Sequence, residues 1–326
     1  SANRALPFAL ESRVLEFLDV EELACLLAVS HDMENLAHQY FRTVSSLKLQ
    51  FPRRKFELCR TIVRVLVAPT ARLQTIRLTG SYLDWLSAEE RDIFVMKLIS
   101  ANASTLRSLY LSSHWWRPHL PYSLAPCHEL REFCPFGALG LTDSAIVLLL
   151  QSARKLAKLH LPPDLDSATL EAALSTPMLT DLSLSLPAAA TAARLNSLTL
   201  RGLTSLDLAA IDNEVATVTE LAQQLPRFAK LLSFKFSCED PLAGVEQLLW
   251  ELPACTTLRI HAKNLPRLRA PQLQTYEDED LSSAARVQIL RQAPALTSIN
   301  MQQGNVGADQ QTELLSAFRQ AADELS

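Results

Sequence analysis

A six-residue pattern recurs along the chain, with leucine or another apolar residue at its first, fourth and sixth positions. Clear copies cover residues 73–78, 106–111, 156–161, 179–184, 203–208 and 231–236, and weaker copies cover residues 130–134, 255–260, 273–277 and 296–301. Successive side chains of a strand point to opposite sides, so each copy predicts a short strand with one apolar face. The fourth positions, which we expect to align between strands, are Ile76, Leu109, Phe133, Leu159, Leu182, Leu206, Phe234, Leu258, Tyr276 and Ile299.

Most of these positions are separated by roughly 18 to 28 residues, the period typical of leucine-rich repeats. Helical spacing of apolar residues marks the intervals 86–103, 142–155, 166–176, 214–225, 241–252 and 281–293. A strand and a helix in alternation predict an α/β leucine-rich-repeat solenoid, a horseshoe with a parallel sheet on its concave face and helices on its convex face. The Asn or Cys that many such repeats carry five residues after the fourth position is mostly missing.

Local signals support the helix boundaries. Thr142 and Asp166 stand at expected helix N-termini, and Pro177, Pro226 and Pro253 stand where the helices should end. A further amphipathic pattern over residues 309–325 predicts a C-terminal helix that caps the sheet.

Composition narrows the class of protein. The 326 residues are 48% hydrophobic, include only 7 glycines and carry a net charge of −4, which disfavours a disordered or strongly nucleic-acid-seeking chain. The six cysteines form no CxxC pair, which suits buried thiols in a reducing compartment. We therefore expect a cytoplasmic or nuclear protein, or one from an organelle matrix if a transit peptide was removed. No apolar run reaches the roughly 18 residues needed to span a membrane.

Residues 1–44 carry a different pattern, with the apolar spacing of two or three short amphipathic helices and a cap at Asp19. The order Leu-Pro, aliphatic pair, Phe-Leu and leucine-rich helix resembles the F-box, and leucine-rich repeats over residues 45–326 follow it directly. The residues that carry the resemblance are Leu6, Pro7, Val14, Leu15, Phe17, Leu18, Asp19, Glu22, Leu23, Leu26, Val29, Ser30, His31, Leu36 and Ala37. Ser30 and Met33 stand where the family has Cys and Trp.

The resemblance implies a non-catalytic substrate receptor that docks on a Skp-type adaptor, which bridges to a cullin scaffold of a ubiquitin ligase. Its adaptor-binding residues would be Leu6, Pro7, Leu10, Val14, Leu15, Leu18, Leu23 and Leu26. Two alternatives stay open. The N-terminal helices can be an apolar cap for the first repeat, and the whole chain can be a structural or assembly subunit without a ligase.

The third and fifth positions of each copy should face the concave surface, because they alternate with the buried ones. These residues are Thr75, Arg77, Ser108, Tyr110, Glu132, Cys134, Lys158, His160, Asp181, Ser183, Ser205, Asp207, Ser233, Lys235, Thr257, Arg259, Ser298 and Asn300. Their mixed charge suits a protein partner better than a phosphate backbone. We expect the partner to contact Arg77, Tyr110, Lys158, His160, Asp181, Asp207, Lys235 and Arg259; for each residue the alternative is a merely solvated side chain.

The segment 112–128 lacks a helical period and contains Trp115 and Trp116, which either form an exposed hot spot or pack on the convex side. Its histidines and cysteines do not match a familiar zinc spacing. The acidic run 277–280 suits a solvated turn better than a metal site. No phosphate loop, GxSxG or HExxH motif occurs, so the sequence predicts neither an enzyme nor a cofactor.

Overall fold

The computed structural model describes residues 35, 45–50, 72–79, 88–112, 120–136, 142–161, 166–186, 202–210, 215–238, 245–264, 266–278, 286, 289 and 293–301. They belong to two compact units, Ser1–Leu156 and Ala157–Ser326. The predicted N-terminal module except residue 35, both tryptophans at 115 and 116, and the C-terminal helix lie outside the described residues. The predicted division after residue 44 therefore stays a prediction.

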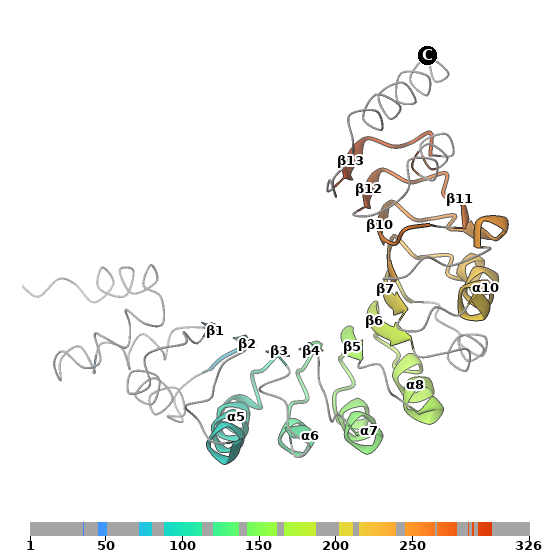
Figure 1. Cartoon of the computed structure of the whole chain (residues 1–326). Helices are drawn as coiled ribbons and strands as arrows, with labels where there is room; N and C mark the ends of the chain where they lie inside the picture. The colour runs from blue at the N-terminus through green and yellow to red at the C-terminus, as the bar shows by residue number, and fades with distance from the viewer. Residues whose placement is uncertain are drawn as a thin grey trace, which may run out of the picture. The chain divides into compact units, whose positions relative to one another are not determined.

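The first unit is a parallel sheet with helices on one side. Its strands follow the chain in the order β1 (Ser46–Gln50), β2 (Thr75–Thr79), β3 (Ser108–Ser112) and β4 (Glu132–Phe136). The helices α5 (Ala88–Asn102), α6 (Leu120–Leu124) and α7 (Asp143–Ser152) lie in a row on one side of the strands, below them in Figure 1. One face of this sheet is therefore covered by helices.

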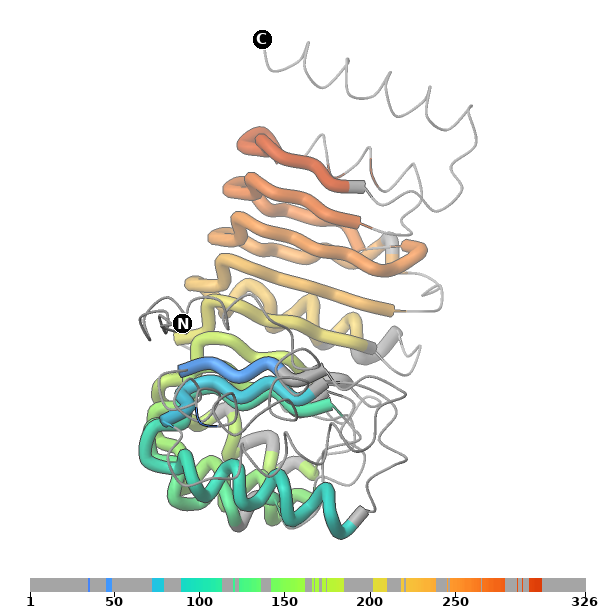
Figure 2. The backbone as a smooth tube through the Cα atoms, turned by 90° about the vertical axis from the view of Figure 1, so that its left-hand side faces the viewer, coloured from blue at the N-terminus to red at the C-terminus, as the bar shows by residue number. Residues whose placement is uncertain are grey.

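The second unit repeats the plan with more varied connections. Its strands pair in parallel in the order β5 (Lys158–Leu161), β6 (Asp181–Leu186), β7 (Ser205–Ala210), β8 (Ser233–Cys238), β10 (Thr257–His261), β12 (Thr275–Asp278) and β13 (Ser298–Met301). The connections hold α8 (Ser167–Leu174), α10 (Val215–Gln224), the 3-10 turns η2 (Leu225–Arg227) and η3 (Val245–Gln247), and a small sheet of β9 (Leu249–Glu251) and β11 (Arg267–Arg269). Figure 2 shows the strands of this unit stacked as successive rungs.

The strand register confirms the predicted fourth positions. In the first unit Leu47, Ile76, Leu109 and Phe133 are successive partners, and in the second Leu159, Leu182, Leu206, Phe234, Leu258, Tyr276 and Ile299 are. All except Ile299 are buried. The apolar rungs are in register within each unit, so each unit has the α/β solenoid architecture of leucine-rich repeats.

Strand β1 was not predicted. The segment Val44 to Leu49 reads as a copy of the pattern with valine at its first position, and Leu47 is its buried fourth residue. The copy of the pattern at residues 203–208 leads into a strand, β7.

Helix predictions are confirmed at α5, α7, α8 and α10 and fail in one interval. Residues 241–252 were predicted to be helical, but the described part of this interval, residues 245–252, contains the 3-10 turn η3 followed by strand β9. Trp250 on β9 is buried against Phe234 and Phe236 of β8, with ring centroids 5.4 and 5.0 Å away. Pro253 therefore follows a strand and does not end a helix. A short helix that was not predicted, α6, lies within segment 112–128.

Threonine supplies the side-chain ladder that the missing Asn and Cys residues do not. The hydroxyls of Thr180, Thr204, Thr256 and Thr297 donate to the backbone carbonyls of Ala157, Thr180, Leu232 and Gln274, at 3.1 to 3.2 Å. Each threonine occupies the second position of its repeat and reaches back to the preceding repeat. This recurrence is visible in the sequence and could have predicted the ladder.

In the first unit a buried amide fixes the end of α5 to the neighbouring repeat. The Asn102 side chain accepts a hydrogen bond from the Leu73 backbone N–H at 2.8 Å and donates to the Leu98 carbonyl at 2.7 Å. It is 1% exposed. The backbone N–H of Leu73 consequently depends on this residue for its partner.

We expect Asn102→Ala to lower the free energy of unfolding by about 1–3 kcal/mol, because a buried backbone N–H would lose its acceptor. Urea denaturation followed by circular dichroism measures the change. Ser100→Ala, at an exposed position of the same helix, should change it by less than about 0.5 kcal/mol. Equal stability of the two variants would show that Asn102 has no anchoring role.

Candidate protein-binding surface

The side of each sheet opposite the helices carries the third and fifth positions of the repeats, and we call it the open face. Strand alternation makes these side chains partly accessible, while the fourth and sixth positions are buried, as in the pattern of β3, β5 and β8. The predicted surface is thus present in both units. Cys134 is the exception, because this fifth-position residue of β4 is buried, at 2% exposure.

The open face of the first unit is built around a tyrosine. The guanidinium of Arg77 lies over the ring of Tyr110, with 4.4 Å between Arg77 Cζ and the ring centroid. The Tyr110 hydroxyl donates a hydrogen bond to the Glu132 carboxylate. Burial and this bond raise the pKa of Tyr110 to about 12, so the phenol stays protonated and keeps its role as donor. Strands β2, β3 and β4 each contribute one member of this cluster.

The open face of the second unit carries charges that pair across neighbouring strands. Lys158 lies 3.4 Å from Asp181, Lys235 lies 3.0 Å from Asp207, and Arg259 lies 2.7 Å from Glu277. In each case the two residues are direct partners in the strand register. Their side chains are between 30% and 55% exposed, so each pair stabilises the sheet by at most about 1 kcal/mol.

His160 lies on β5 among these charges. Burial lowers its pKa, Asp207 acts in the opposite direction, and Lys235 and Lys158 lower it further. The His160 imidazole therefore loses its proton at a lower pH than a histidine side chain in water.

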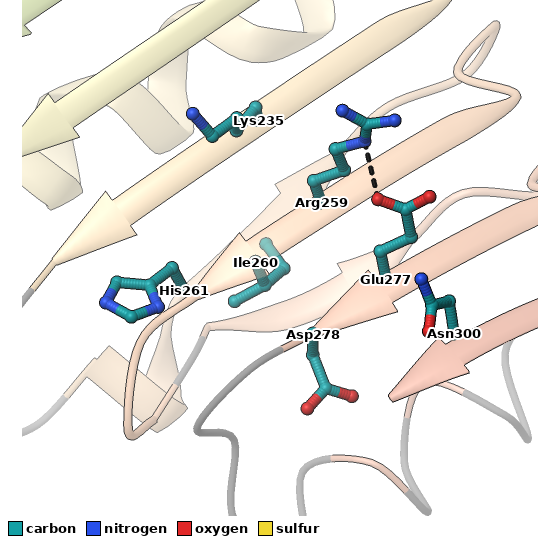
Figure 3. A pocket seen from close by; sticks show the side chains of 7 residues that line it. All are labelled: Lys235, Arg259, Ile260, His261, Glu277, Asp278 and Asn300. Carbon is teal, nitrogen blue, oxygen red and sulfur yellow. Dashed lines mark ion pairs between the residues drawn. The ribbon is translucent and has the colours of Figure 1, made fainter. Parts of the chain in front are cut away.

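A hollow of about 240 Å³ opens on the same face toward the end of the second unit. It is lined by Lys235, Arg259, Ile260, His261, Glu277, Asp278 and Asn300 (Figure 3). Figure 3 shows the Glu277 side chain directed toward Arg259 and the Asp278 side chain directed away from it. The lining comes from four strands, β8, β10, β12 and β13, so a partner that enters the hollow would contact several repeats.

Residues 277 and 278 correct the prediction of a solvated acidic turn. Both belong to β12, where Glu277 takes the fifth position and Asp278 takes the sixth. Asp278 is 2% exposed and accepts hydrogen bonds from Arg286 Nε at 2.9 and 3.1 Å. The prediction for residues 277–280 was wrong because the first two residues continue a strand, in which alternation places the Glu277 carboxylate on the open face and the Asp278 carboxylate in the core.

The structure brings together most of the predicted contact residues. Arg77 and Tyr110 are in contact in the first unit. The second unit pairs Lys158 with Asp181 and Asp207 with Lys235, and His160 lies near Lys158, Asp207 and Lys235. Trp115, Trp116 and all the predicted adaptor-binding residues lie outside the described residues. Lys48 and Glu277, which also lie on the open face, were not predicted as contacts, although the repeat register identifies both.

The described residues contain no group of three or more histidine, cysteine or acidic side chains placed to hold a metal ion. Cys127, Cys134, Cys238 and Cys255 are buried, as predicted. Burial raises the pKa of Cys127 to about 12 and that of Cys255 to about 11. None of the described helices has the length and apolar character needed to cross a membrane.

No family model matches the chain, and no curated protein matches it. Among solved structures, it is similar to a chain in the yeast Rad7 and Elc1 complex, at 18% identity and a TM-score of 0.47, over 78% of this chain and 68% of that one. The leucine-rich repeat-containing protein LegL7 from Legionella pneumophila has 15% identity and a TM-score of 0.47, over 88% and 94% of the two chains. The protein LIC12759 from Leptospira interrogans has 13% identity and a TM-score of 0.30, over 86% and 84%. The repeat class given above rests on the strand register of the chain itself.

Proposed function

We propose that the chain is a non-catalytic protein-binding module that holds a partner on the open face of its sheets. The observation that carries the proposal is the strand register, which spaces polar and charged side chains regularly on rungs fixed by buried leucines. Such a face is rigid before a partner arrives, so binding costs little ordering of the backbone. Arginine and tyrosine, the residue types enriched at binding hot spots, are both present on it.

The more specific proposal is a substrate receptor of a Skp-cullin-F-box type ubiquitin ligase in the cytoplasm or nucleus. The F-box-like pattern at Leu6, Pro7, Leu15 and Leu18 supports it, together with the repeats that follow. In this arrangement the N-terminal helices bind the adaptor and the open face presents the substrate. Neither task requires a catalytic residue, a metal or a cofactor.

A structural or assembly subunit is the second candidate. Ser30 and Met33, at the positions where the F-box has Cys and Trp, favour it, because the aromatic anchor for the adaptor is absent. The same open face would then hold a permanent partner in a larger complex.

We expect the intact chain to recover a Skp-type adaptor and a cullin from cell extract, and Leu15→Asp with Leu18→Asp to recover neither. Charged residues would disrupt an apolar helix-in-groove contact, with a loss of at least about tenfold in bound adaptor measured by quantitative mass spectrometry. Ile93→Asp with Met96→Asp, at two exposed apolar positions of α5, is the matched control and should keep the adaptor. If the intact chain recovers only a fixed set of other proteins, the assembly subunit is the correct alternative.

A further inference from the structure

The two open faces differ in whether their positive charges are paired with carboxylates. In the second unit, each of Lys158, Lys235 and Arg259 has its own carboxylate on an adjacent strand. In the first unit, Lys48 and Arg77 are direct partners in the register of β1 and β2, so two cations start from neighbouring backbone positions about 4.8 Å apart. Like charges placed opposite each other in a sheet are unfavourable. Within the part of the chain that the structure describes, no carboxylate pairs with either one.

The Arg77 guanidinium is positioned by an aromatic ring and has no anionic partner among the described residues. Arg77 Cζ lies over the Tyr110 ring, 4.4 Å from its centroid, so the ring lies against one side of the group. Stacking uses the face of the guanidinium and leaves the N–H groups on its edge available. The nearest acidic residue of the cluster, Glu132, is engaged by the Tyr110 hydroxyl. A planar, pre-oriented guanidinium with an available edge is suited to bind a carboxylate through two parallel hydrogen bonds.

Two more cations stand at the start of the neighbouring strands. Arg107 and Arg131 occupy exposed positions immediately before β3 and β4, and the Arg131 backbone N–H donates to the Arg107 carbonyl at 2.7 Å, which places the two in one row. The other acidic residue nearby, Glu129, forms an ion pair with Lys155 at 2.5 Å. The described open face of the first unit and its leading edge therefore have an excess of positive charge, whereas the chain as a whole has a net charge of −4.

We propose that the open face of the first unit binds an acidic segment of a protein partner, with Arg77 as the anchor for an aspartate or glutamate carboxylate and Lys48 beside it. This inference deepens the proposed protein-binding role of the open face and does not depend on an adaptor or a ligase. Nucleic acid fits less well, because a phosphate backbone requires a longer basic stripe than β1 to β4 provide, and Glu132 interrupts it.

The test is a fluorescence anisotropy titration of the purified full chain with a labelled peptide in which Glu alternates with Ser. A peptide with Gln in place of every Glu and a single-stranded oligothymidine are the comparison probes. We expect the Glu peptide to bind, its affinity to fall as salt rises, and the Gln peptide to bind at least about tenfold more weakly.

Variants then locate the site. Arg77→Gln should weaken binding of the Glu peptide by about tenfold or more. Arg77→Lys should weaken it by less, because lysine keeps the positive charge although it cannot form the two parallel hydrogen bonds of a guanidinium. Lys48→Gln should weaken it by a few-fold. Lys97→Gln, an exposed cation on α5 at the other side of the sheet, is the control and should leave the affinity unchanged. All variants are checked for unchanged circular dichroism and urea midpoint.

Three results would overturn the inference: no binding of the Glu peptide, equal binding of the Glu and Gln peptides, or the same affinity in Arg77→Gln as in Lys97→Gln. Tighter binding of oligothymidine than of the Glu peptide, lost in Arg77→Gln, would assign the surface to nucleic acid instead. The titration contains no adaptor or cullin, so its outcome is independent of the pull-down that tests the ligase.

Discussion

Replacement of Arg286 by alanine is expected to lower the free energy of unfolding by about 3–5 kcal/mol. The side chains of Asp278 and Arg286 are 0% and 5% exposed, and their ion pair is the most buried one among the described residues. Removal of the guanidinium leaves the buried Asp278 carboxylate without the positive charge of Arg286. The penalty comes from this buried negative charge and exceeds the net stabilisation that the pair provides in the native protein.

Urea denaturation of the full chain, monitored by circular dichroism, measures this loss. Arg269→Ala is the matched control, because its partner Glu251 lies 3.2 Å away and the two side chains are 73% and 38% exposed. That variant should change stability by at most about 1 kcal/mol. Similar losses in the two variants would mean that burial of Asp278 is not the cause.

A double replacement separates the buried charge from the packing. Asp278 takes the sixth position of its repeat, where Leu184, Leu208 and Ile260 stand in other repeats. Asp278→Leu combined with Arg286→Met should therefore be close to neutral or stabilising, since an apolar pair of similar volume needs no desolvation of charge. If the double variant is as unstable as Arg286→Ala, the pair contributes through its geometry and not through the charge that is left behind.

The strand positions were predictable from the sequence because one periodic signal determines them. Once the fourth positions are aligned, the fifth positions are aligned too, and the opposite charges at Asp207 and Lys235 or at Arg259 and Glu277 become neighbours. The ion pairs of the open face therefore follow from the repeat register alone. The absence of leucine at position 44 is the reason that β1 was missed.

Features that depend on contacts outside this register could not be predicted. The partner of Asp278 comes from Arg286 in the return segment, where no repeat rule fixes the position. The stacking of Arg77 on Tyr110 requires side-chain rotamers, and the burial of Cys134 shows that a fifth position is not always accessible. Strand alternation predicts the side of the sheet and does not predict how deeply each residue is covered.

The connection before β10 shows how packing overrides local spacing. Residues 248–252 are apolar at four of five positions, a run that fits a helix or a strand equally well. The core of this repeat is aromatic, with Phe234 and Phe236 at the fourth and sixth positions of β8, and Trp250 meets both rings edge to face at 73° and 81°. The extended backbone of β9 alternates an exposed Leu249 with a buried Trp250. Aromatic packing thus decides the conformation of this segment.

Trp250→Ala is expected to cost about 3–5 kcal/mol, the range for removal of a fully buried large aromatic side chain. Trp250→Phe should cost less than about 2 kcal/mol, because it keeps an aromatic ring between Phe234 and Phe236 and removes an indole N–H that has no acceptor among the described residues. Leu249→Ala, at the adjacent position with 45% exposure, should stay within about 0.5 kcal/mol of the parent chain. Urea midpoints of the three variants rank their losses of stability. If Trp250→Phe loses as much stability as Trp250→Ala, the indole itself, and not an aromatic ring in general, holds β9 against the sheet.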